Sequence, residues 1–307
     1  ISANYSGNDI QEKIHNFLSD VYHNYGSLYV LFGGDVNVVP ARMIPGKHDG
    51  HSYNYHLFYP ADLYYVAIDN SWDANKNGVY GESVDNADDH PDFYYGRAPV
   101  ETVIEASTFV LKCEEYETLS EINPIDRLYV NNIVGLQAYL SLPGYYHDYR
   151  MQKMEKLFDY VNSNNNLHSG ISQNNIVRWR GYDPYDFVGS VNYENYHFNL
   201  SKSNALACFG DVIPTSNDKR SHIILHCDHS SYLSLGTSAK LNNMTVDRYD
   251  MSMLSNNPFY QILFTVGCSP GEYDKDCIVE RLLNNTSAGA VAVCASSQTS
   301  IVGEEDM

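Results

Sequence analysis

The chain has 307 residues, of which 43% are hydrophobic and 19% charged, a balance typical of a globular protein rather than a disordered one. Its 19 basic and 38 acidic residues give a net charge of −19, which repels phosphate backbones and argues against a nucleic-acid partner. No apolar run approaches the roughly 20 residues of a membrane-spanning helix, so no membrane span is predicted.

The first third of the chain alternates between helical and strand patterns. Apolar residues recur at helical spacing over 9–24, and an apolar run at 27–32 enters the loop Gly33-Gly34-Asp35. A second strand is predicted at 93–97 and a long helix at 100–119. The alternation predicts strands connected by helices.

The same alternation continues to the end of the chain. Short apolar runs bounded by polar, loop-like sequence are typical of buried strands, and amphipathic spacing is typical of helices. The predicted strands are 127–134, 176–179, 222–227, 261–266 and 288–295, and the predicted helices are 147–163 and 277–283.

Strands that alternate with helices form right-handed crossovers and a mostly parallel sheet covered by helices on its faces. The predicted fold class is therefore α/β, arranged in two lobes over 1–123 and 124–307, with Pro124 as the break between them. In such sheets the chemistry lies beyond the carboxyl ends of the strands. The residues that follow each strand are thus the candidate functional residues.

Two strand ends carry side chains suited to catalysis. His229 follows the run 222–227, and Cys268 follows the run 261–266. Neighbouring parallel strands would bring the two residues into one cleft, where an imidazole can activate a thiol as a nucleophile. His226 is the rival base, but it lies inside the apolar run and is expected to point away from that cleft.

The six cysteines allow a plainer interpretation. None of them forms a CxxC pair, so neither a zinc site nor a thioredoxin-like site is predicted. A cysteine at a strand end is often an inert, small hydrophobic residue. Taken alone, the His229 and Cys268 pattern leaves both interpretations open.

The segment 73–82 has the spacing of a calcium loop. Asp73, Asn75 and Asn77 place oxygen ligands at alternate positions, Gly78 follows, and Glu82 can close the site. The closing glutamate of an EF-hand is absent, because Val84 stands at that position. A plain Asn- and Gly-rich turn is the alternative.

Several ordered blocks resemble the gingipain family of cysteine peptidases, which is related more distantly to caspases and legumains. The blocks cover nearly the whole chain, and they surround both His229 and Cys268. They are 29–35 with 39–42, 61–65, 93–97, His229 with Gly236-Thr237, 266–268 with Gly271 and 277–282, 295–296, and 303–307.

The resemblance implies a caspase-like fold and a thiol-dependent endopeptidase that acts on proteins or peptides. His229 and Cys268 would be its catalytic pair, and the backbone N–H of Ser230 would be an oxyanion donor. Gln137 stands where the family has the carboxylate that supports the histidine. Calcium sites occur in this family. Secretion is also expected, and it agrees with N-x-[ST] sequons at Asn4, Asn199, Asn243, Asn284 and Asn285.

The resemblance also concerns substrate choice. Asp148 stands where Arg-specific members carry the acid at the base of the S1 pocket, so cleavage after Arg or Lys is predicted. A carboxylate there would pair with a guanidinium through two charge-assisted hydrogen bonds. An ordinary aspartate near a helix N-terminus is the alternative interpretation.

Several residues depart from the family pattern. Asp228 and Ser230 flank the histidine where the family has glycines, and Gly267 precedes the cysteine where the family has alanine. Gln137 replaces a carboxylate, and an amide stabilises an imidazolium less. A catalytically inactive binding module of the same fold is therefore the alternative function.

Relative to the family, the chain lacks elements at both ends, including a strand before its first helix. Missing strands would expose apolar edges, which folded proteins cover or pair. A companion fragment of the same precursor is therefore predicted, in keeping with a zymogen that is processed by proteolysis. Unseen disordered segments and a trimmed chain are the alternatives.

Overall fold

The structure is a computed structural model of the 307-residue chain. It describes residues 1, 3–48, 52–122, 126–137, 156–160, 176–180, 198–210, 220–237 and 245–298. None of the helices within these ranges is both long and apolar enough to cross a bilayer.

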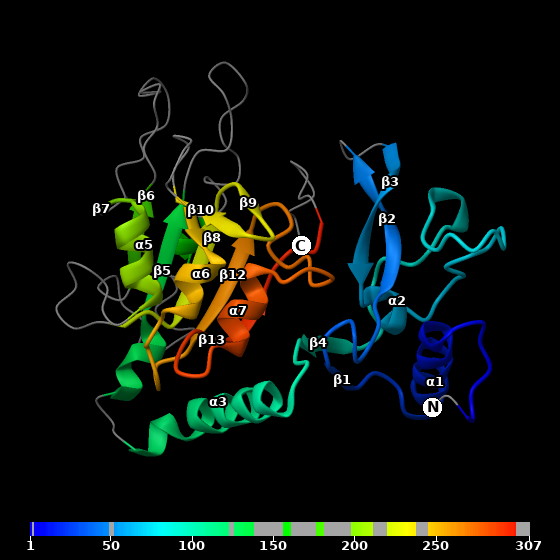
Figure 1. Cartoon of the computed structure of the whole chain (residues 1–307), viewed down its shortest axis with the longest axis horizontal. Coiled ribbons are helices and arrows are strands. Elements are labelled where there is room, and N and C mark those ends of the chain that lie inside the picture. The colour runs from blue at the N-terminus through cyan, green and yellow to red at the C-terminus, as the bar shows by residue number, and fades with distance from the viewer. Residues whose placement is uncertain are drawn as a thin grey trace.

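Helices and short strands follow one another along the described chain (Figure 1). In chain order they are α1 Ile10–Tyr25, β1 Tyr29–Gly33, β2 Arg42–His48, β3 Ser52–Ala61, α2 Leu63–Val66, η1 Ser83–Asp85, β4 Tyr94–Ala98, α3 Val103–Ile122, η2 Asp126–Asn131, β5 Ile133–Gln137, β6 Ile176–Arg180, β7 Phe198–Asn199, α5 Lys202–Phe209, β8 Ile223–Cys227, β9 Ser230–Ser231, β10 Ser234–Gly236, β11 Thr245–Asp247, α6 Arg248–Ser252, β12 Gln261–Val266, α7 Ile278–Asn284 and β13 Ala290–Cys294.

A six-stranded sheet organises the C-terminal part of the chain. Its strand order is β13-β12-β8-β5-β6-β7, and every neighbouring pair is parallel. Because parallel neighbours share one direction, all the carboxyl ends of these strands lie along the same edge. This edge carries the loops in which the sequence places its candidate catalytic residues.

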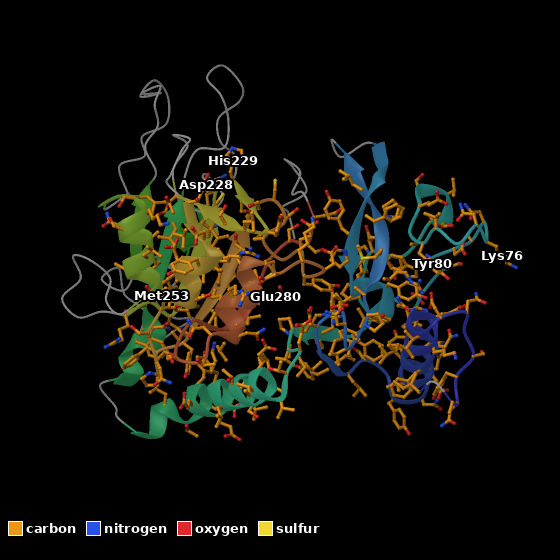
Figure 2. All side chains as sticks on the ribbon, viewed as in Figure 1. Lys76, Tyr80, Asp228, His229, Met253 and Glu280 are labelled. Atoms are coloured by element: carbon orange, nitrogen blue, oxygen red, sulfur yellow. The ribbon has the colours of Figure 1, made fainter. Side chains whose placement is uncertain are left out.

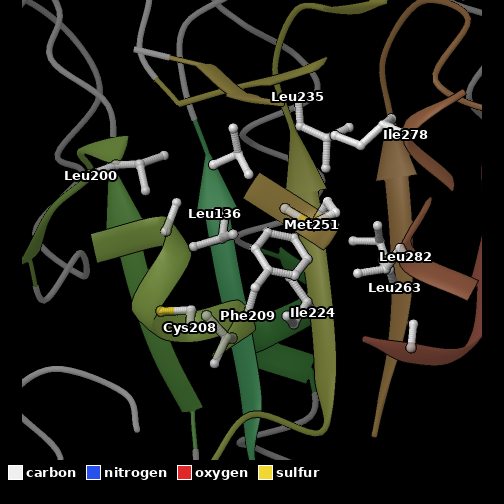
Figure 3. Close-up of a cluster of buried hydrophobic side chains, with 14 residues drawn as sticks. Leu136, Leu200, Cys208, Phe209, Ile224, Leu235, Met251, Leu263, Ile278 and Leu282 are labelled. Atoms are coloured by element: carbon white, nitrogen blue, oxygen red, sulfur yellow. The ribbon is translucent and has the colours of Figure 1, made fainter. Parts of the chain in front are cut away.

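The strand residues of this sheet alternate between two covered faces. On one face, Leu136, Ile224 and Leu263 pack with residues of α5, α6 and α7 in the main buried cluster (Figure 3). On the other face, Ile133 packs with Phe158 of the helical turn 156–160. The apolar runs of β5 and β8 are thus explained by burial on both faces, whereas β12 and β13 leave Phe264 and Cys294 exposed on one face.

The N-terminal part has its own, more aromatic core. The helices α1 and α2 pack against a two-stranded parallel sheet, β1-β4, and the antiparallel hairpin β2-β3 lies beside them (Figure 1). The buried residues of this core are Leu18, Phe32, Tyr64, Tyr65, Val66, Ala67, Trp72 and Phe93. The Arg97 guanidinium holds this part together, since it donates to the carboxylate of Asp62 and to the carbonyls of Gly34 and Val39.

The strands β1 and β4 also carry exposed apolar side chains. Tyr29 is 86% exposed, Leu31 61% and Tyr94 66%. The rings of Tyr29 and Tyr94 stack on each other with centroids 5.0 Å apart. We call Tyr29, Leu31 and Tyr94 the β1–β4 patch.

The helix α3 is packed against the C-terminal sheet. The ammonium group of Lys112 is buried and donates to the carbonyls of Leu282, Leu283 and Ala288, at 3.3, 2.9 and 2.8 Å. These carbonyls lie at the C-terminal end of α7 and just beyond it. The predicted lobe boundary at 123/124, which assigns α3 to the first lobe, stays a prediction.

The predicted elements are present with shifted ends, apart from one segment. Residues 126–131 form the 3₁₀ helix η2 instead of the beginning of a strand, and β5 starts at Ile133. The sequence interpretation also missed the β2-β3 hairpin and the short helices α5 and α6. Of the predicted helix 147–163, residues 156–160 are described, and they are helical.

Candidate active site

The strands β8 and β12 position the two candidate catalytic residues. They are neighbours in the sheet, paired in parallel from Ile223–Ile262 to Cys227–Val266. The chain then continues into His229 from β8 and into Cys268 from β12. Figure 2 shows Asp228 and His229 at this edge of the sheet. The structure therefore places the two predicted loops side by side, as the sequence analysis expects of parallel neighbours.

Asp228 fixes the backbone beside His229. Its side chain is fully buried, and its Oδ1 accepts a hydrogen bond of 2.6 Å from the backbone N–H of His229. Gly236 lies against the same turn, since a Cβ there would lie 2.5 Å from both Asp228 Oδ2 and the carbonyl oxygen of His229. The carboxylate of Asp228, a residue that departs from the family pattern, thus fixes the backbone of the loop that carries His229.

His226, the rival base, is used within the sheet. It is buried, and its Nε2 lies 2.8 Å from the carbonyl oxygen of Gly236, which accepts only, so Nε2 carries the proton. Its Nδ1 lies 2.8 Å from the hydroxyl of Thr265 and accepts from it. Burial lowers the pKa of His226 to about 4. The ring is therefore neutral, and both of its nitrogens are engaged by Thr265 and Gly236.

The turn after Cys268 is tightly held. Ser269 adopts a left-handed backbone with φ of 57°, an uncommon conformation for a residue with a side chain. The backbone N–H of Ser269 donates to the carbonyl of Gln298 at 2.9 Å, and that of Gly271 donates to Ser296 at 2.9 Å. These bonds tie the cysteine loop to the segment that follows β13. Sequence reasoning missed this, because the two segments are about thirty residues apart.

Gln137, the predicted support of the histidine, is the last residue of β5. It is buried and pairs with Cys227 in the β5–β8 ladder, two residues before His229. Its Nε2 has no hydrogen-bond partner among the described residues. The structure thus places an amide beside the candidate site, and its role toward His229 stays a prediction. Asp148 and the block 303–307 lie outside the described residues.

The four predicted calcium ligands are gathered in one loop. Asp73 Oδ1 accepts from the backbone N–H of Asn77 at 2.9 Å, and Asn75 Oδ1 accepts from the same N–H at 3.0 Å. Glu82 Oε2 accepts from the side-chain amides of Asn75 and Asn77, at 3.0 and 2.6 Å. Gly78 supplies the left-handed turn, with φ of 81°. Carboxylate and amide oxygens are the ligands that calcium prefers, so these residues fit the ion.

An acidic cluster that the sequence analysis did not consider lies nearby in the chain. His90 Nδ1 is 2.7 Å from Asp89 Oδ1 and 3.5 Å from Asp88 Oδ1. These three side chains are close enough together to hold a metal ion. His90 and Asp89 are largely exposed, and exposed acidic groups are common without a metal. We therefore assign no site to this cluster.

A cavity of about 480 Å³ lies between the two parts of the molecule. Residues of β3 and β4 line one side and residues of α7 and β13 the other, and the lining includes neither His229 nor Cys268. Beside it, the buried carboxyl groups of Asp35 and Glu280 hydrogen-bond each other, which requires a proton between them. Burial raises the pKa of both carboxyls, and that of Glu280 reaches about 8.

Comparisons with known proteins agree with this arrangement. The family model described as Peptidase family C25 matches residues 1–307. The crystal structure of the Arg-specific cysteine proteinase gingipain R (RgpB) is 17% identical with a TM-score of 0.60, over 94% of this chain and 53% of its own. The complex of the Porphyromonas gingivalis RgpB pro- and mature domains is also 17% identical with a TM-score of 0.60, and the match covers 94% of this chain and 54% of that one.

These structural matches confirm the predicted caspase-like α/β fold. The chain spans about half the length of the gingipain chains that it matches. No curated protein matches the sequence significantly.

Proposed function

Because the chain belongs to peptidase family C25 over its whole length, we propose that it is a cysteine endopeptidase with Cys268 as nucleophile and His229 as its partner. The observation that carries the proposal is the parallel pairing of β8 with β12, whose carboxyl ends lead into the loops of His229 and Cys268. A thiol and an imidazole on adjacent loops are the groups that acyl transfer requires.

The proposed reaction proceeds in two halves. The Cys268 thiol transfers its proton to His229, and its sulfur attacks the scissile carbonyl to form a tetrahedral intermediate. The backbone N–H groups of Cys268 and Ser230 stabilise the oxyanion. The leaving amine departs with the proton held by His229, which leaves an acyl-enzyme. Water then adds to the thioester with His229 as base, and the peptide acid and the thiol are released.

Two neighbours support the histidine in this scheme. Asp228 holds the backbone N–H of His229 at 2.6 Å and so limits the positions that the ring can take. Gln137 lies at the end of the adjoining strand β5, where its amide oxygen can orient the imidazole. An amide stabilises the imidazolium less than a carboxylate, so we expect a moderate rather than a fast enzyme.

We further propose cleavage after Arg or Lys, with Asp148 at the base of the S1 pocket. The support is the resemblance around Asp148 and the acidic charge of the chain, which favours basic peptides. The gingipain R match is described as Arg-specific, which is a property of that protein. Asp148→Asn should reduce kcat/KM about 100-fold or more on Arg and Lys substrates, and leave apolar substrates little changed.

The proposal is tested with fluorogenic peptides that carry Arg, Lys, Asn, Asp or Leu at P1, under reducing conditions and with calcium present. Turnover by the wild type and a loss of roughly 1,000-fold or more in both Cys268→Ala and His229→Ala would support the mechanism. Turnover that survives Cys268→Ala would exclude Cys268 as nucleophile. The absence of turnover with every peptide, together with saturable peptide binding, would favour the inactive binding module instead.

A structural calcium ion is proposed at Asp73, Asn75, Asn77 and Glu82. The support is that hydrogen bonds hold the four side chains together in one turn, all of them carboxylates or amides. In Figure 2, Lys76 of this loop and His229 lie far apart in the molecule. The ion would therefore stabilise the N-terminal part and take no share in the chemistry.

We also propose a companion polypeptide that covers the β1–β4 patch, formed by Tyr29, Leu31 and Tyr94. In a two-stranded sheet both strands are edge strands, and here both carry exposed apolar side chains. Folded proteins normally pair or cover such edge strands. The RgpB complex of pro- and mature domains shows a companion domain for that protein. Secretion as a zymogen is part of the same proposal.

A further inference from the structure

The two loops of the candidate active site are joined by one side chain. The Ser230 hydroxyl donates a hydrogen bond of 3.2 Å to the backbone carbonyl of Cys268. Ser230 directly follows His229, and the two bonded residues are 38 positions apart in the chain. The bond therefore connects the residue after the proposed base to the backbone of the proposed nucleophile.

Gly267 makes room for this bond. A Cβ at position 267 would lie 2.1 Å from Ser230 Oγ, 3.0 Å from Ser230 Cβ and 2.7 Å from the carbonyl oxygen of Asp228. Such approaches are far below van der Waals contact, and one of them is to backbone, which cannot turn aside as a side chain can. Gly267 is also buried, so the strand end cannot move outward without losing packing.

Backbone conformation does not explain this glycine. The glycines with a left-handed φ among the described residues are Gly26, Gly78, Gly81 and Gly289, and Gly267 is not one of them. An alanine could adopt its backbone angles, so the requirement for glycine comes from the space that the Ser230 side chain and the Asp228 carbonyl oxygen occupy. Residues 230 and 267 therefore form a size-matched pair.

These positions are two of the departures from the gingipain pattern, which has glycine after the histidine and alanine before the cysteine. In this chain the larger side chain stands on the histidine loop and the glycine on the cysteine loop. Each departure alone would leave a clash or a gap, and together they leave neither. We propose that Ser230 is a positioning residue that holds the Cys268 backbone against the His229 loop, and that Gly267 is its obligatory partner.

This inference rests on the proposed peptidase function, but its consequences extend to the reactivity of the thiol. The hydrogen bond holds the Cys268 carbonyl and so restrains the peptide plane that follows the nucleophile. Removing Ser230 Oγ loosens that plane, which then keeps only the bond from the Ser269 N–H to the carbonyl of Gln298, and it leaves the thiol and the imidazole untouched. The expected result is a lower kcat at nearly constant KM, because the loss falls on the alignment of Sγ in the transition state.

The experiment compares Ser230→Ala, Ser230→Gly, Gly267→Ala and the double variant Ser230→Gly/Gly267→Ala. We expect Ser230→Ala to lower kcat about 5- to 10-fold, and Gly267→Ala about 100-fold. The double variant should recover part of the loss, about 3- to 10-fold relative to Gly267→Ala alone, since the new Cβ then meets only the Asp228 carbonyl oxygen and no side chain at position 230. Melting temperatures of all variants show which effects are losses of folding.

A second measurement does not need turnover. The rate at which iodoacetamide alkylates Cys268 is followed from about pH 5 to 9 by peptide mass spectrometry. Ser230→Ala should change how the alkylation rate of Cys268 depends on pH. It should leave the pH dependence of Cys294 alkylation unchanged. If the wild type turns over no peptide but the alkylation profile shifts as stated, the peptidase proposal fails and the positioning role stands.

Two results would overturn the inference itself. One is a Gly267→Ala variant with the kcat, alkylation profile and melting temperature of the wild type, which would show that the two residues do not compete for space. The other is a double variant no better than Gly267→Ala, which would show that Ser230 is not what the new Cβ meets.

Discussion

His229 and Cys268 each lie two residues beyond the last paired rung of the β8–β12 ladder, which joins Cys227 to Val266. Equal offsets from one rung place the two backbones at the same height above the sheet. The relation depends only on strand register. A one-residue slip of β12 would turn every β12 side chain to the opposite face and take Cys268 out of line with His229.

The first prediction concerns the reactivity of Cys268. At about pH 7, iodoacetamide should label Cys268 roughly 10-fold or more faster than Cys294, although Cys294 is more exposed. Burial raises the pKa of the Cys294 and Cys113 thiols, which keeps both of them protonated. His229→Ala should remove the advantage of Cys268. Equal labelling of Cys268, Cys294 and Cys113 in the wild type would argue against an activated nucleophile.

The second prediction concerns calcium. Excess chelator should lower the melting temperature of the wild type by about 1.5 to 3 °C, if the ion contributes about 1 to 2 kcal/mol and the chain unfolds as one unit of this size. Asp73→Ala should melt at the chelated temperature and no longer respond to calcium. Asp89→Ala, in the exposed cluster nearby, is the matched control and should respond like the wild type. A melting curve that chelator leaves unchanged would remove the site.

The third prediction follows from the buried, neutral His226. Its pKa of about 4 lies below the ordinary 6.5. Between these two pH values the histidine is protonated in the unfolded chain and neutral in the folded chain. The free energy of unfolding should therefore fall as the pH drops from about 6.5 toward 4. The difference of about 2.5 pKa units corresponds to about 3 kcal/mol. Urea unfolding between about pH 7 and 5 should show that the free energy of unfolding depends less on pH in His226→Gln than in the wild type. The control His23→Gln, at an exposed position, should keep the pH dependence of the wild type.

The fourth prediction has the opposite sign and concerns Glu280. Burial raises its pKa from 4.5 to about 8, so the folded chain holds a proton that the unfolded chain releases. This contribution to stability is complete below about pH 4.5 and is lost as the pH rises through about 8. In Glu280→Gln the amide stays neutral, and it can still accept from Cys277 and donate to Asp35.

Glu280→Gln should therefore be more stable than the wild type at about pH 8, and the two should converge at about pH 5. Melting temperatures measured across this range check the prediction, with the exposed Glu114→Gln as control. A variant that melts below the wild type at the alkaline end would show that Glu280 is ionised in the folded chain.

The fifth prediction concerns Lys112, whose Nζ donates to three buried carbonyls at the end of α7 and whose pKa is lowered by burial to about 7. Lys112→Met keeps the volume of the side chain and leaves those carbonyls without a donor. We expect a loss of about 2 to 4 kcal/mol in the free energy of unfolding, measured in urea. Lys156→Met, at an exposed position, should stay within about 0.5 kcal/mol of the wild type.

Much of the fold could be predicted because its strands are short and mostly apolar, even where one face is partly exposed, as in β12 and β13. The runs that became β8, β12 and β13 are apolar along most of their length, a pattern that few other structures produce. The gingipain-like resemblance is confirmed by the match to peptidase family C25. The β2-β3 hairpin was missed because Pro45 and Gly46 interrupt the alternation, at the point where its register shifts.

The sequence allowed individual residues of the candidate site to be predicted, but not the contacts between them. The positions of His229 and Cys268 after two apolar runs were visible in the sequence. The contact of Ser230 with Gly267 was not, because it depends on the register of two strands and on atoms that a glycine lacks. Asp228 looked like a departure from a pattern, and its bond to the backbone of His229 becomes apparent only in three dimensions.

The strand order β13-β12-β8-β5-β6-β7 reverses its direction between β5 and β8. From β5 the chain builds outward through β6 and β7, and from β8 it builds the opposite way through β12 and β13. Such a reversal is a topological switch point, and in open α/β sheets ligands bind beyond the carboxyl ends of the strands at such a point. Gln137 ends β5, and His229 and Cys268 follow β8 and β12 at the same carboxyl edge, whereas the packed core lies between the strands and the helices α5, α6 and α7. Substitutions in the loops at this edge can therefore change the candidate site at little cost to folding, since the buried cluster that stabilises the sheet does not include them.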